Sequence, residues 1–386
     1  MLLHFFRSTG RAALCLLFAK AAEAGSVTLQ AQCFAPENLR ALSGERTPVK
    51  GDRDFDKLMP SKDLTAPRPP VEAPMRGAIR RVELPKGEKL IALTFDLCEQ
   101  RGEVAGYDGE IFDYLRRENV KATLFGGGKW MRSHQTRTQQ LMTDPLFELA
   151  NHSETHRNLR LLDPAGVQNE IAAPQRAFEQ ARQHLASTQC AARVPDSLSG
   201  IQTRLTMFRF PFGACNAAAL NAVNDAGLLA IQWDLSTGDP DPHQSAQAIA
   251  NALIRNTHPG SIIISHGNGR GWNTAAALPL AIPKLKAMGY EFVTVSELLA
   301  RGKPVITATC YDAHPGDTDR YDFLSGLHGK GMLTAQRANG NQPLPWATTT
   351  EPSKRSAQSR DMAHGPASAP GSGTSGGFLP TLSWPF

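Results

Sequence analysis

The sequence predicts an α/β fold in which parallel strands alternate with helices, and three observations lead to this class. Hydrophobic residues make up 41% of the 386 residues and charged residues 20%, which is enough apolar material for a sizeable core. At roughly 150 residues per domain, the length allows two or three domains, or one barrel of about 230 residues with tails. Between residues 90 and 300, strand-like and helix-like segments alternate seven times, which favours parallel strands with right-handed crossovers.

The seven strand-like runs are short, apolar and rich in strand-forming residues. They cover residues 90–96, 121–125, 147–151, 206–211, 228–233, 261–265 and 290–295. Segments with helical spacing or composition follow them at 109–119, 135–143, 164–187, 216–226, 244–256, 274–288 and 297–300. Such a series can close into a barrel or stay open as a doubly wound sheet, and in both cases chemistry collects at the carboxyl ends of the strands.

Titratable residues stand where the predicted strands end. These are Asp96, His152, His156, Arg209, Asp234 and His266. We therefore expect the functional site at this end of the strands.

The two ends of the chain differ from this middle part. Residues 1–24 are expected to be an export signal, because two arginines precede the apolar run 12–19 and Ala22-Glu23-Ala24 has the small-x-small shape of a cleavage site. We therefore expect the protein to be periplasmic or extracellular. No stretch of 18 uncharged apolar residues exists, so a stable membrane span is not expected.

The remaining boundaries follow from composition. Residues 25–79 form a Pro-rich, extended lead-in, 80–302 the main domain and 303–330 a C-terminal extension. Residues 331–386 are rich in Gly, Ser, Ala, Thr and Pro, which is typical of a disordered, low-complexity tail. The net charge is +5 and no basic run exceeds two residues, so no nucleic-acid partner is indicated.

Five of the six cysteines remain once the predicted signal, with Cys15, is removed. An odd number leaves at least one thiol outside an intramolecular pair, and an oxidising compartment favours one or two bridges. A Cys33–Cys310 bridge would tie the two ends of the folded part together, and Cys190–Cys215 is a second pairing. The sequence alone does not fix the connectivity.

The segment His152-Ser153-Glu154-Thr155-His156 points to a metal. Histidines at i and i+4 face the same side of a helical turn, so both rings can reach one ion. The pattern is H-x-E-x-H, so the metalloprotease reading of H-E-x-x-H does not apply. A zinc-type catalytic site takes about three protein ligands, which leaves one carboxylate to find. The candidates are Asp96, Glu99 and Asp108, of which Asp96 is best placed.

Two further residues complete a catalytic set. His266 enters from another strand as a candidate general acid, and Asp234 or Asp239 would pair with it and raise its pKa. Arg209 lies inside an apolar run, where a charge needs a partner, and Asp96 would serve as that partner.

Five segments in this order resemble the motifs of the polysaccharide deacetylases of the NodB-homology type, a carbohydrate esterase family 4-like group. They are Thr94–Asp96, His152–His156, Arg209–Gly213, Trp233–Asp239 and Ser265–His266. The resemblance covers residues 80–302 and implies a distorted (β/α)7 TIM-like barrel that hydrolyses carbon–nitrogen bonds other than peptide bonds. It also implies a divalent metal, for which zinc is the default and cobalt, nickel or manganese fit the same ligands.

The resemblance further implies individual roles. Asp96 would be the base, His266 the acid, and Arg209 the residue that orients the base. Asp234 lies in the motif that tunes the acid, and His152 and His156 would hold the metal. The substrate would contact Phe212 and Gly213, near an amide that holds the oxyanion, and would stack on Trp233 and Trp272.

One position departs from the family pattern. The family has two adjacent aspartates in the first motif, and here the second position is Leu97. Either Asp108, less readily Glu99, takes the missing role, or the metal is held differently. Cys98 could bind zinc as a thiolate, although packing is the favoured interpretation of a buried thiol.

The leading interpretation is a secreted metal-dependent hydrolase that removes N-acetyl groups from a polysaccharide or oligosaccharide by means of metal-activated water. Peptidoglycan, a chitin-like chain or an exopolysaccharide would be the substrate. One alternative is an amidohydrolase for a small non-sugar amide. Another is a catalytically degenerate barrel that binds glycan, in which Leu97 marks a lost ligand.

Overall fold

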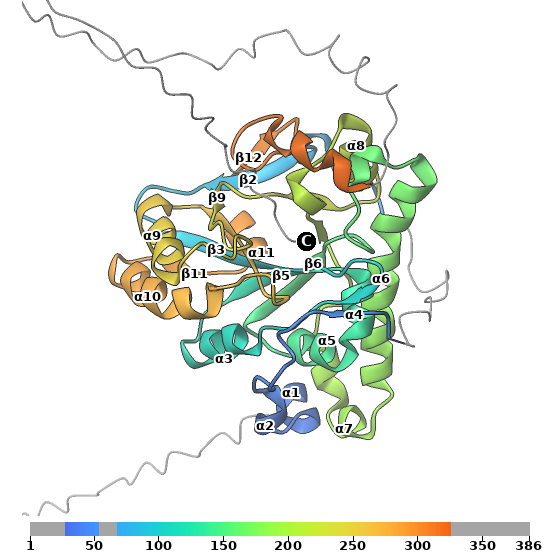
Figure 1. Cartoon of the computed structure of the whole chain (residues 1–386). Helices are drawn as coiled ribbons and strands as arrows, with labels where there is room; N and C mark the ends of the chain where they lie inside the picture. The colour runs from blue at the N-terminus through green and yellow to red at the C-terminus, as the bar shows by residue number, and fades with distance from the viewer. Residues whose placement is uncertain (1–27, 54–67, 326–386) are drawn as a thin grey trace, which may run out of the picture.

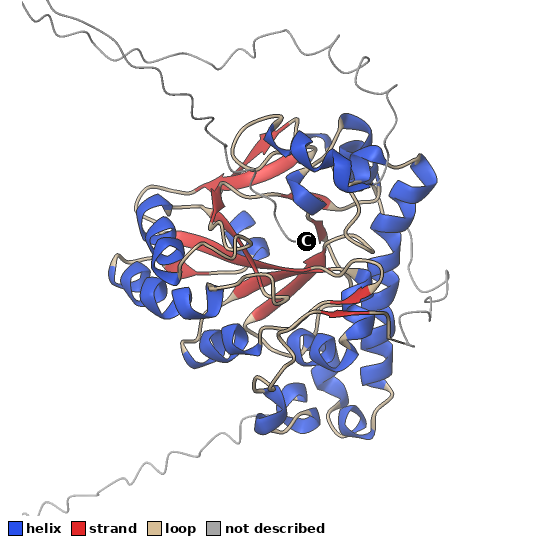
Figure 2. Cartoon of the chain, in the orientation of Figure 1, coloured by secondary structure: helices blue, strands red, loops and turns tan. Residues whose placement is uncertain are grey.

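The computed structural model describes residues 28–53 and 68–325 (Figure 1). The predicted export signal (1–24) and low-complexity tail (331–386) lie outside the described residues. The described part is a curled sheet with helices packed around its outer side (Figure 2). This is the predicted α/β class.

Seven parallel strands form the body of the sheet. In spatial order they are β2 (Ala78–Glu83), β8 (Leu229–Ile231), β7 (Met207–Phe208), β6 (Phe147–Asn151), β5 (Ala122–Gly126), β3 (Leu90–Leu97) and β10 (Ile262–His266). A short antiparallel bridge between Arg81 and Ser261 links the two ends of this series. The arrangement is a distorted (β/α)7 barrel, as predicted.

Short strands extend this body. An antiparallel strand, β12 (Lys303–Thr307), pairs with β2, and β9 (Leu235–Ser236) pairs with β10. A separate ribbon joins β1 (Val49–Lys50) to β4 (Glu103–Val104).

Six of the seven predicted strands belong to the parallel series, and the seventh does not. The run 290–295 yields only β11 (Glu291–Phe292), which pairs with the start of β3. Its place is taken by β2, which the sequence does not reveal because Arg80 and Arg81 interrupt its apolar pattern. Arg80 is nevertheless buried, since its guanidinium lies 3.6 Å from the Tyr311 ring centroid and donates to the Tyr311 carbonyl at 2.6 Å.

The helices occupy the predicted segments, and their ends shift by at most two residues. They are α3 (Gly109–Arg117), α5 (Gln135–Met142), α6 (Pro164–Ala186), α8 (Ala217–Asp225), α9 (Ala246–Asn256), α10 (Thr274–Ala287) and α11 (Val295–Leu299). Side-chain caps set the starts of several, including Asp163 for α6, Asn216 for α8 and Ser245 for α9.

Further short helices lie between these elements. They are α1 (Leu29–Cys33), α2 (Pro36–Leu39), α4 (Gly128–Ser133), α7 (Gln189–Ala192), η3 (Ala73–Met75), η4 (Leu159–Leu161), η5 (Pro195–Gly200), η6 (Pro211–Gly213) and η7 (Asp317–Ser325). None of the helices in residues 28–53 and 68–325 combines the length and hydropathy needed to cross a membrane.

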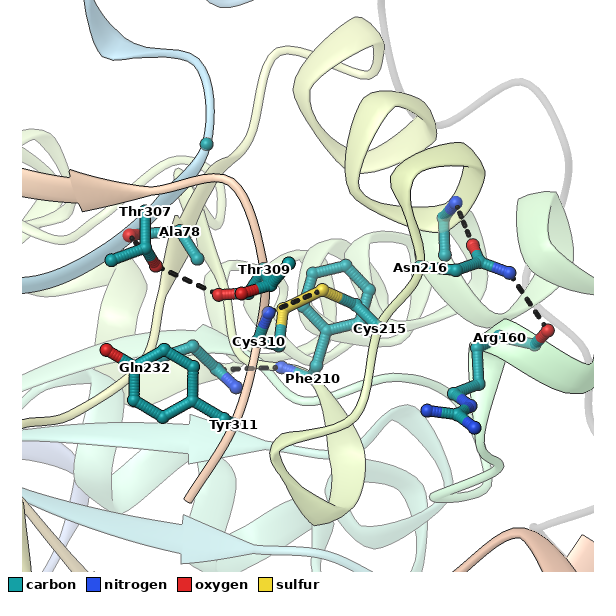
Figure 3. Close-up of a disulfide and its surroundings, with 12 residues drawn as sticks. Ala78, Arg160, Phe210, Cys215, Asn216, Gln232, Thr307, Thr309, Cys310 and Tyr311 are labelled. Carbon is teal, nitrogen blue, oxygen red and sulfur yellow. Dashed lines mark hydrogen bonds between the residues drawn. A yellow bond between two sulfur atoms is a disulfide. The ribbon is translucent and has the colours of Figure 1, made fainter. Parts of the chain in front are cut away.

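Two disulfides cross-link the described part of the chain, and both pairings considered from the sequence are wrong. Cys33 pairs with Cys190, and Cys215 pairs with Cys310. The reason is local packing: α1 lies against α7, which carries Cys190. The chain leaving β12 passes the loop before α8, so Cys310 meets Cys215 (Figure 3).

Candidate active site

Asp96 lies at the centre of the site and is held by Arg209. Strand register places Asp96 beside Phe125 of β5 and His266 of β10. One guanidinium nitrogen of Arg209, Nη1, donates to Asp96 Oδ1 at 2.9 Å and to Thr94 Oγ1 at 2.7 Å. The predicted contact between Arg209 and Asp96 is therefore present.

This ion pair is buried, with Arg209 0% and Asp96 3% exposed. The guanidinium lies 3.8 Å from the centroid of the Phe125 ring. Burial by itself would raise the pKa of the Asp96 carboxyl, but the neighbouring His152 and Arg209 outweigh it and lower the pKa. Asp96 is thus kept ionised.

The two histidines of the H-x-E-x-H segment lie on a tight turn after β6, and the expected helical turn is wrong. Ser153 and His156 adopt φ values of 64° and 54°, which interrupt any helix. The turn is held by the Glu170 carboxylate, which accepts from the backbone amides of Glu154 and Thr155 at 2.9 and 2.8 Å. The turn still brings the ring centroids of the two histidines to 5.0 Å.

Both histidines present ring nitrogens that have no hydrogen-bond partner among the described residues. His152 Nδ1 lies 3.0 Å from the Arg209 carbonyl, so Nδ1 carries the proton and Nε2 has the lone pair. His152 Nε2 and His156 Nδ1 are buried and unpartnered, although His152 Nε2 lies 3.3 Å from Asp96 Oδ2.

Burial lowers the pKa of His152, against the opposing effect of Asp96, and lowers the pKa of His156 well below its usual range. Neutral imidazoles with unused lone pairs are the form that binds metals.

A third candidate ligand lies beside these two histidines. Among the described residues, Cys98 is the cysteine that forms no disulfide. It forms a group with His152 and His156 in which the ligand atoms lie within 4.8 Å of one another. Burial raises the pKa of the Cys98 thiol to about 12. The donor set of one sulfur and two imidazoles fits a zinc-type ion.

Two of the three acids considered for the third position, Asp108 and Glu99, lie elsewhere. Asp108 stands at the start of α3 and pairs with Arg46 at 3.2 Å, and burial raises its pKa to about 6. Glu99 is held by Lys129 at 2.6 Å and by the Ala105 amide at 2.9 Å. Neither belongs to the group around the histidines.

Of the two aspartates considered as partners of His266, Asp239 is the one that pairs with it, and Asp234 is not. His266 Nδ1 lies 2.9 Å from Asp239 Oδ1, and Thr274 donates to the other carboxylate oxygen at 2.7 Å. Burial would lower the pKa of His266, but the Asp239 carboxylate raises it above the usual value. Asp234 instead accepts from the Ile262 amide at 2.9 Å and pairs with His258 at 2.9 Å.

A cleft with a cavity volume of about 230 Å³ opens onto these groups. Its lining includes Asp96, Cys98, His156, Phe210, Phe212, Trp233, Asp239, His266, Arg270, Trp272, Asp312, Arg320 and Tyr321. Trp272 is 42% exposed, and the Trp233 indole donates to Asp312 Oδ1 at 3.1 Å.

Phe212 lines the cleft, whereas Gly213 is not among its lining residues and lies behind the Trp233 ring. Both have positive φ, 60° and 63°, and a Cβ on Gly213 would lie 3.0 Å from Trp233. Glycine is therefore required behind the Trp233 ring. The Phe212 ring meets His156 edge-on, with centroids 4.5 Å apart.

The segment after β12 forms another part of the wall, which sequence reasoning missed. Tyr321 of η7 stacks on Phe212 with centroids 5.5 Å apart, and Asp312 and Arg320 also line the cleft. The Cys215–Cys310 bridge anchors the start of this segment (Figure 3). In the sequence, the aromatic and charged residues between 311 and 322 were the feature that would have indicated this part of the wall.

Comparison with known proteins matches residues 83–197 to the polysaccharide deacetylase family. A peptidoglycan-N-acetylglucosamine deacetylase of Bacillus cereus is 30% identical over 220 residues, which cover 56% of this chain and 91% of that protein. A chitooligosaccharide deacetylase of Azorhizobium caulinodans is 26% identical over 219 residues, covering 53% of this chain and 92% of the relative.

Among solved structures, a CE4 family pseudoenzyme from Bacillus anthracis aligns with 24% identity and a TM-score of 0.48, covering 60% of this chain and 71% of that one. The Bacillus cereus relative is matched over nearly its whole length. The chain therefore belongs to the polysaccharide deacetylase family, hydrolases of carbon–nitrogen bonds outside peptides.

Proposed function

We propose that the chain removes N-acetyl groups from the N-acetylglucosamine units of an extracytoplasmic glycan, with peptidoglycan as the first candidate. The observation that carries the proposal is the pairing of Asp96 with His266 across adjacent strands, beside two histidines with unused ring nitrogens. An ionised carboxylate and a histidine with a raised pKa in one cleft make a base and an acid pair.

The reaction divides between these two groups. Asp96 accepts a proton from the water that attacks the acetamide carbonyl, and Arg209 holds the carboxylate in place. His266 gives its proton to the departing amine, so that the C–N bond breaks and acetate and a glucosamine unit result. The backbone near Phe212 stabilises the oxyanion, and Trp233 and Trp272 contact the sugar faces.

A divalent cation completes this site, with zinc as the first candidate. When bound, such an ion lowers the pKa of a water molecule and polarises the carbonyl. His152 and His156 would hold it, because each ring has one buried nitrogen without a hydrogen-bond partner among the described residues. Two disulfides fit the oxidising compartment expected of an exported chain.

The test is acetate release by the purified chain after zinc addition. Peptidoglycan, N-acetylated chitooligosaccharides and a small non-sugar acetamide are assayed in parallel, with His152→Ala as the control. Release from a glycan that is lost in the variant supports the proposal. Release from the small amide alone would favour the second enzyme class, and no release from any substrate would favour a glycan-binding barrel.

The pH dependence of this reaction offers a matched pair of variants. His266 donates a proton, so activity is present below the pKa of His266 and is lost as pH rises through it. Asp239→Asn removes the charge that raises this pKa, so the alkaline limb of the kcat profile is expected to move to lower pH. Asp234→Asn is the control, because Asp234 pairs with His258 and not with His266.

A further inference from the structure

The residue that lines the cleft after Asp96 is Cys98, and strand alternation explains why. Successive side chains of a strand point to opposite faces, so the position next to Asp96 turns away from the cleft. Leu97 accordingly belongs to the hydrophobic core, whereas Cys98 returns to the cleft side. The leucine at the family's second aspartate position therefore does not empty the site, because a donor atom stands one residue further on.

The sulfur of Cys98 is held in place by a buried side chain. Asn268, which is 0% exposed, donates through Nδ2 to the Cys98 carbonyl at 2.8 Å and to Cys98 Sγ at 3.1 Å. An N–H donor aimed at sulfur stabilises negative charge on that sulfur. Asn268 lies two residues after His266, so β10 positions both groups.

The donor atoms around this sulfur are those of a metal site. His152 and His156 each offer a ring nitrogen to the group whose ligand atoms lie within 4.8 Å of one another. Each ring also has a buried nitrogen without a hydrogen-bond partner among the described residues. Leaving such nitrogens without a partner costs free energy unless a ligand satisfies them. In a tetrahedral zinc site, bond lengths of 2.0–2.3 Å separate the ligand atoms by roughly 3.3–3.6 Å. Side-chain rotations that move each donor atom by about 1 Å would therefore bring the three atoms to this spacing.

We propose that Cys98 is the third metal ligand of this chain and that Asn268 is the residue that positions it. The inference rests on the proposed function in that the metal serves the same cleft. It adds that the ligand set is one thiolate and two imidazoles, which leaves Asp96 to act as base. Thiolate ligands favour zinc and cobalt(II) over magnesium and manganese(II), so the site is expected to select the former ions.

The decisive experiment uses cobalt as a probe. The full chain loaded with cobalt(II) is expected to show a sulfur-to-cobalt charge-transfer band in the near ultraviolet. Cys98→Ser, nearly the same shape, is expected to lose that band and to bind zinc at least tenfold more weakly in competition with a chromophoric chelator. Cys98→Asp is expected to regain zinc binding without the band.

The positioning role is tested by the near-isosteric Asn268→Asp variant. It removes the N–H donor to sulfur, so zinc affinity is expected to fall by about 10–100-fold while the band persists. Asn273→Asp, whose side chain donates to the Gln244 carbonyl at 2.8 Å, is the control and should keep its zinc affinity. Equal zinc affinity in Asn268→Asp and the unmodified chain would overturn this role.

A cobalt spectrum of the unmodified chain without a thiolate band, or unchanged zinc affinity in a folded Cys98→Ser, would overturn the ligand assignment. If that variant does not fold, the spectrum of the unmodified chain still decides. The outcome is separable from the proposed function. A thiolate band without acetate release supports the ligand set and contradicts the deacetylase activity. Acetate release without the band supports the deacetylase activity and contradicts the ligand set.

Discussion

Replacing Asp96 by asparagine is expected to lower kcat for acetate release by about 10²–10⁴-fold, the range that general base catalysis supplies. The amide has nearly the shape of the carboxylate and still accepts from Arg209, but it takes up no proton. The measurement is kcat at saturating glycan, together with the zinc content of the purified variant.

The zinc content separates two roles for this carboxylate. If Asp96 acts as base alone, the variant keeps its zinc and loses its rate. Loss of zinc along with the rate would contradict this prediction and make Asp96 a ligand.

Replacing Arg209 by methionine is expected to lower the free energy of unfolding by about 3–5 kcal/mol, because it leaves the Asp96 carboxylate buried without its cationic partner. Urea unfolding at neutral pH measures the loss. The double variant Arg209→Met with Asp96→Asn should recover part of it, since the buried charge is then removed as well.

The exposed pair of Arg76 and Asp225, 2.7 Å apart, supplies the control. Both side chains reach solvent, so Arg76→Met is expected to cost about 0–1 kcal/mol. The pKa of Asp96 is lowered by folding, so its pair contributes stability above the unfolded-state pKa, and this is lost as pH falls through the folded-state pKa. Equal losses in the two arginine variants would contradict the prediction.

The alternation of strand-like and helix-like segments was enough to predict an α/β fold with parallel strands and the end of the strands where polar residues gather. The choice of a barrel over an open sheet came from the resemblance to the family. Asp96, His152, Arg209 and His266 meet because the carboxyl ends of parallel strands share one end of the barrel. The strand β2 escaped prediction because its Arg80 is buried by contacts with Tyr311, more than 200 residues away in sequence. Hydrophobic periodicity contains no information on such a contact.

Which of several neighbouring residues enters the site depends on the paths of the loops that follow the strands. Asp234 and Asp239 follow the same strand, and only the course of the chain after β9 brings Asp239 to His266. For Cys98 the sequence favoured packing over metal binding, because the proposed metal role depends on Asn268 and on a turn with two positive φ values. Short-range spacing does not specify these conformations.

The strand β2, which completes the barrel, also determines where a shortened form of this protein can begin. The family match begins at residue 83, the last residue of β2, and a fragment cut there would lack nearly the whole strand. Its neighbours β8 and β12 would then each expose an unpaired edge. Exposed edges pair with strands of other molecules, so such a fragment is expected to self-associate. A minimal soluble fragment must therefore begin before Ala78.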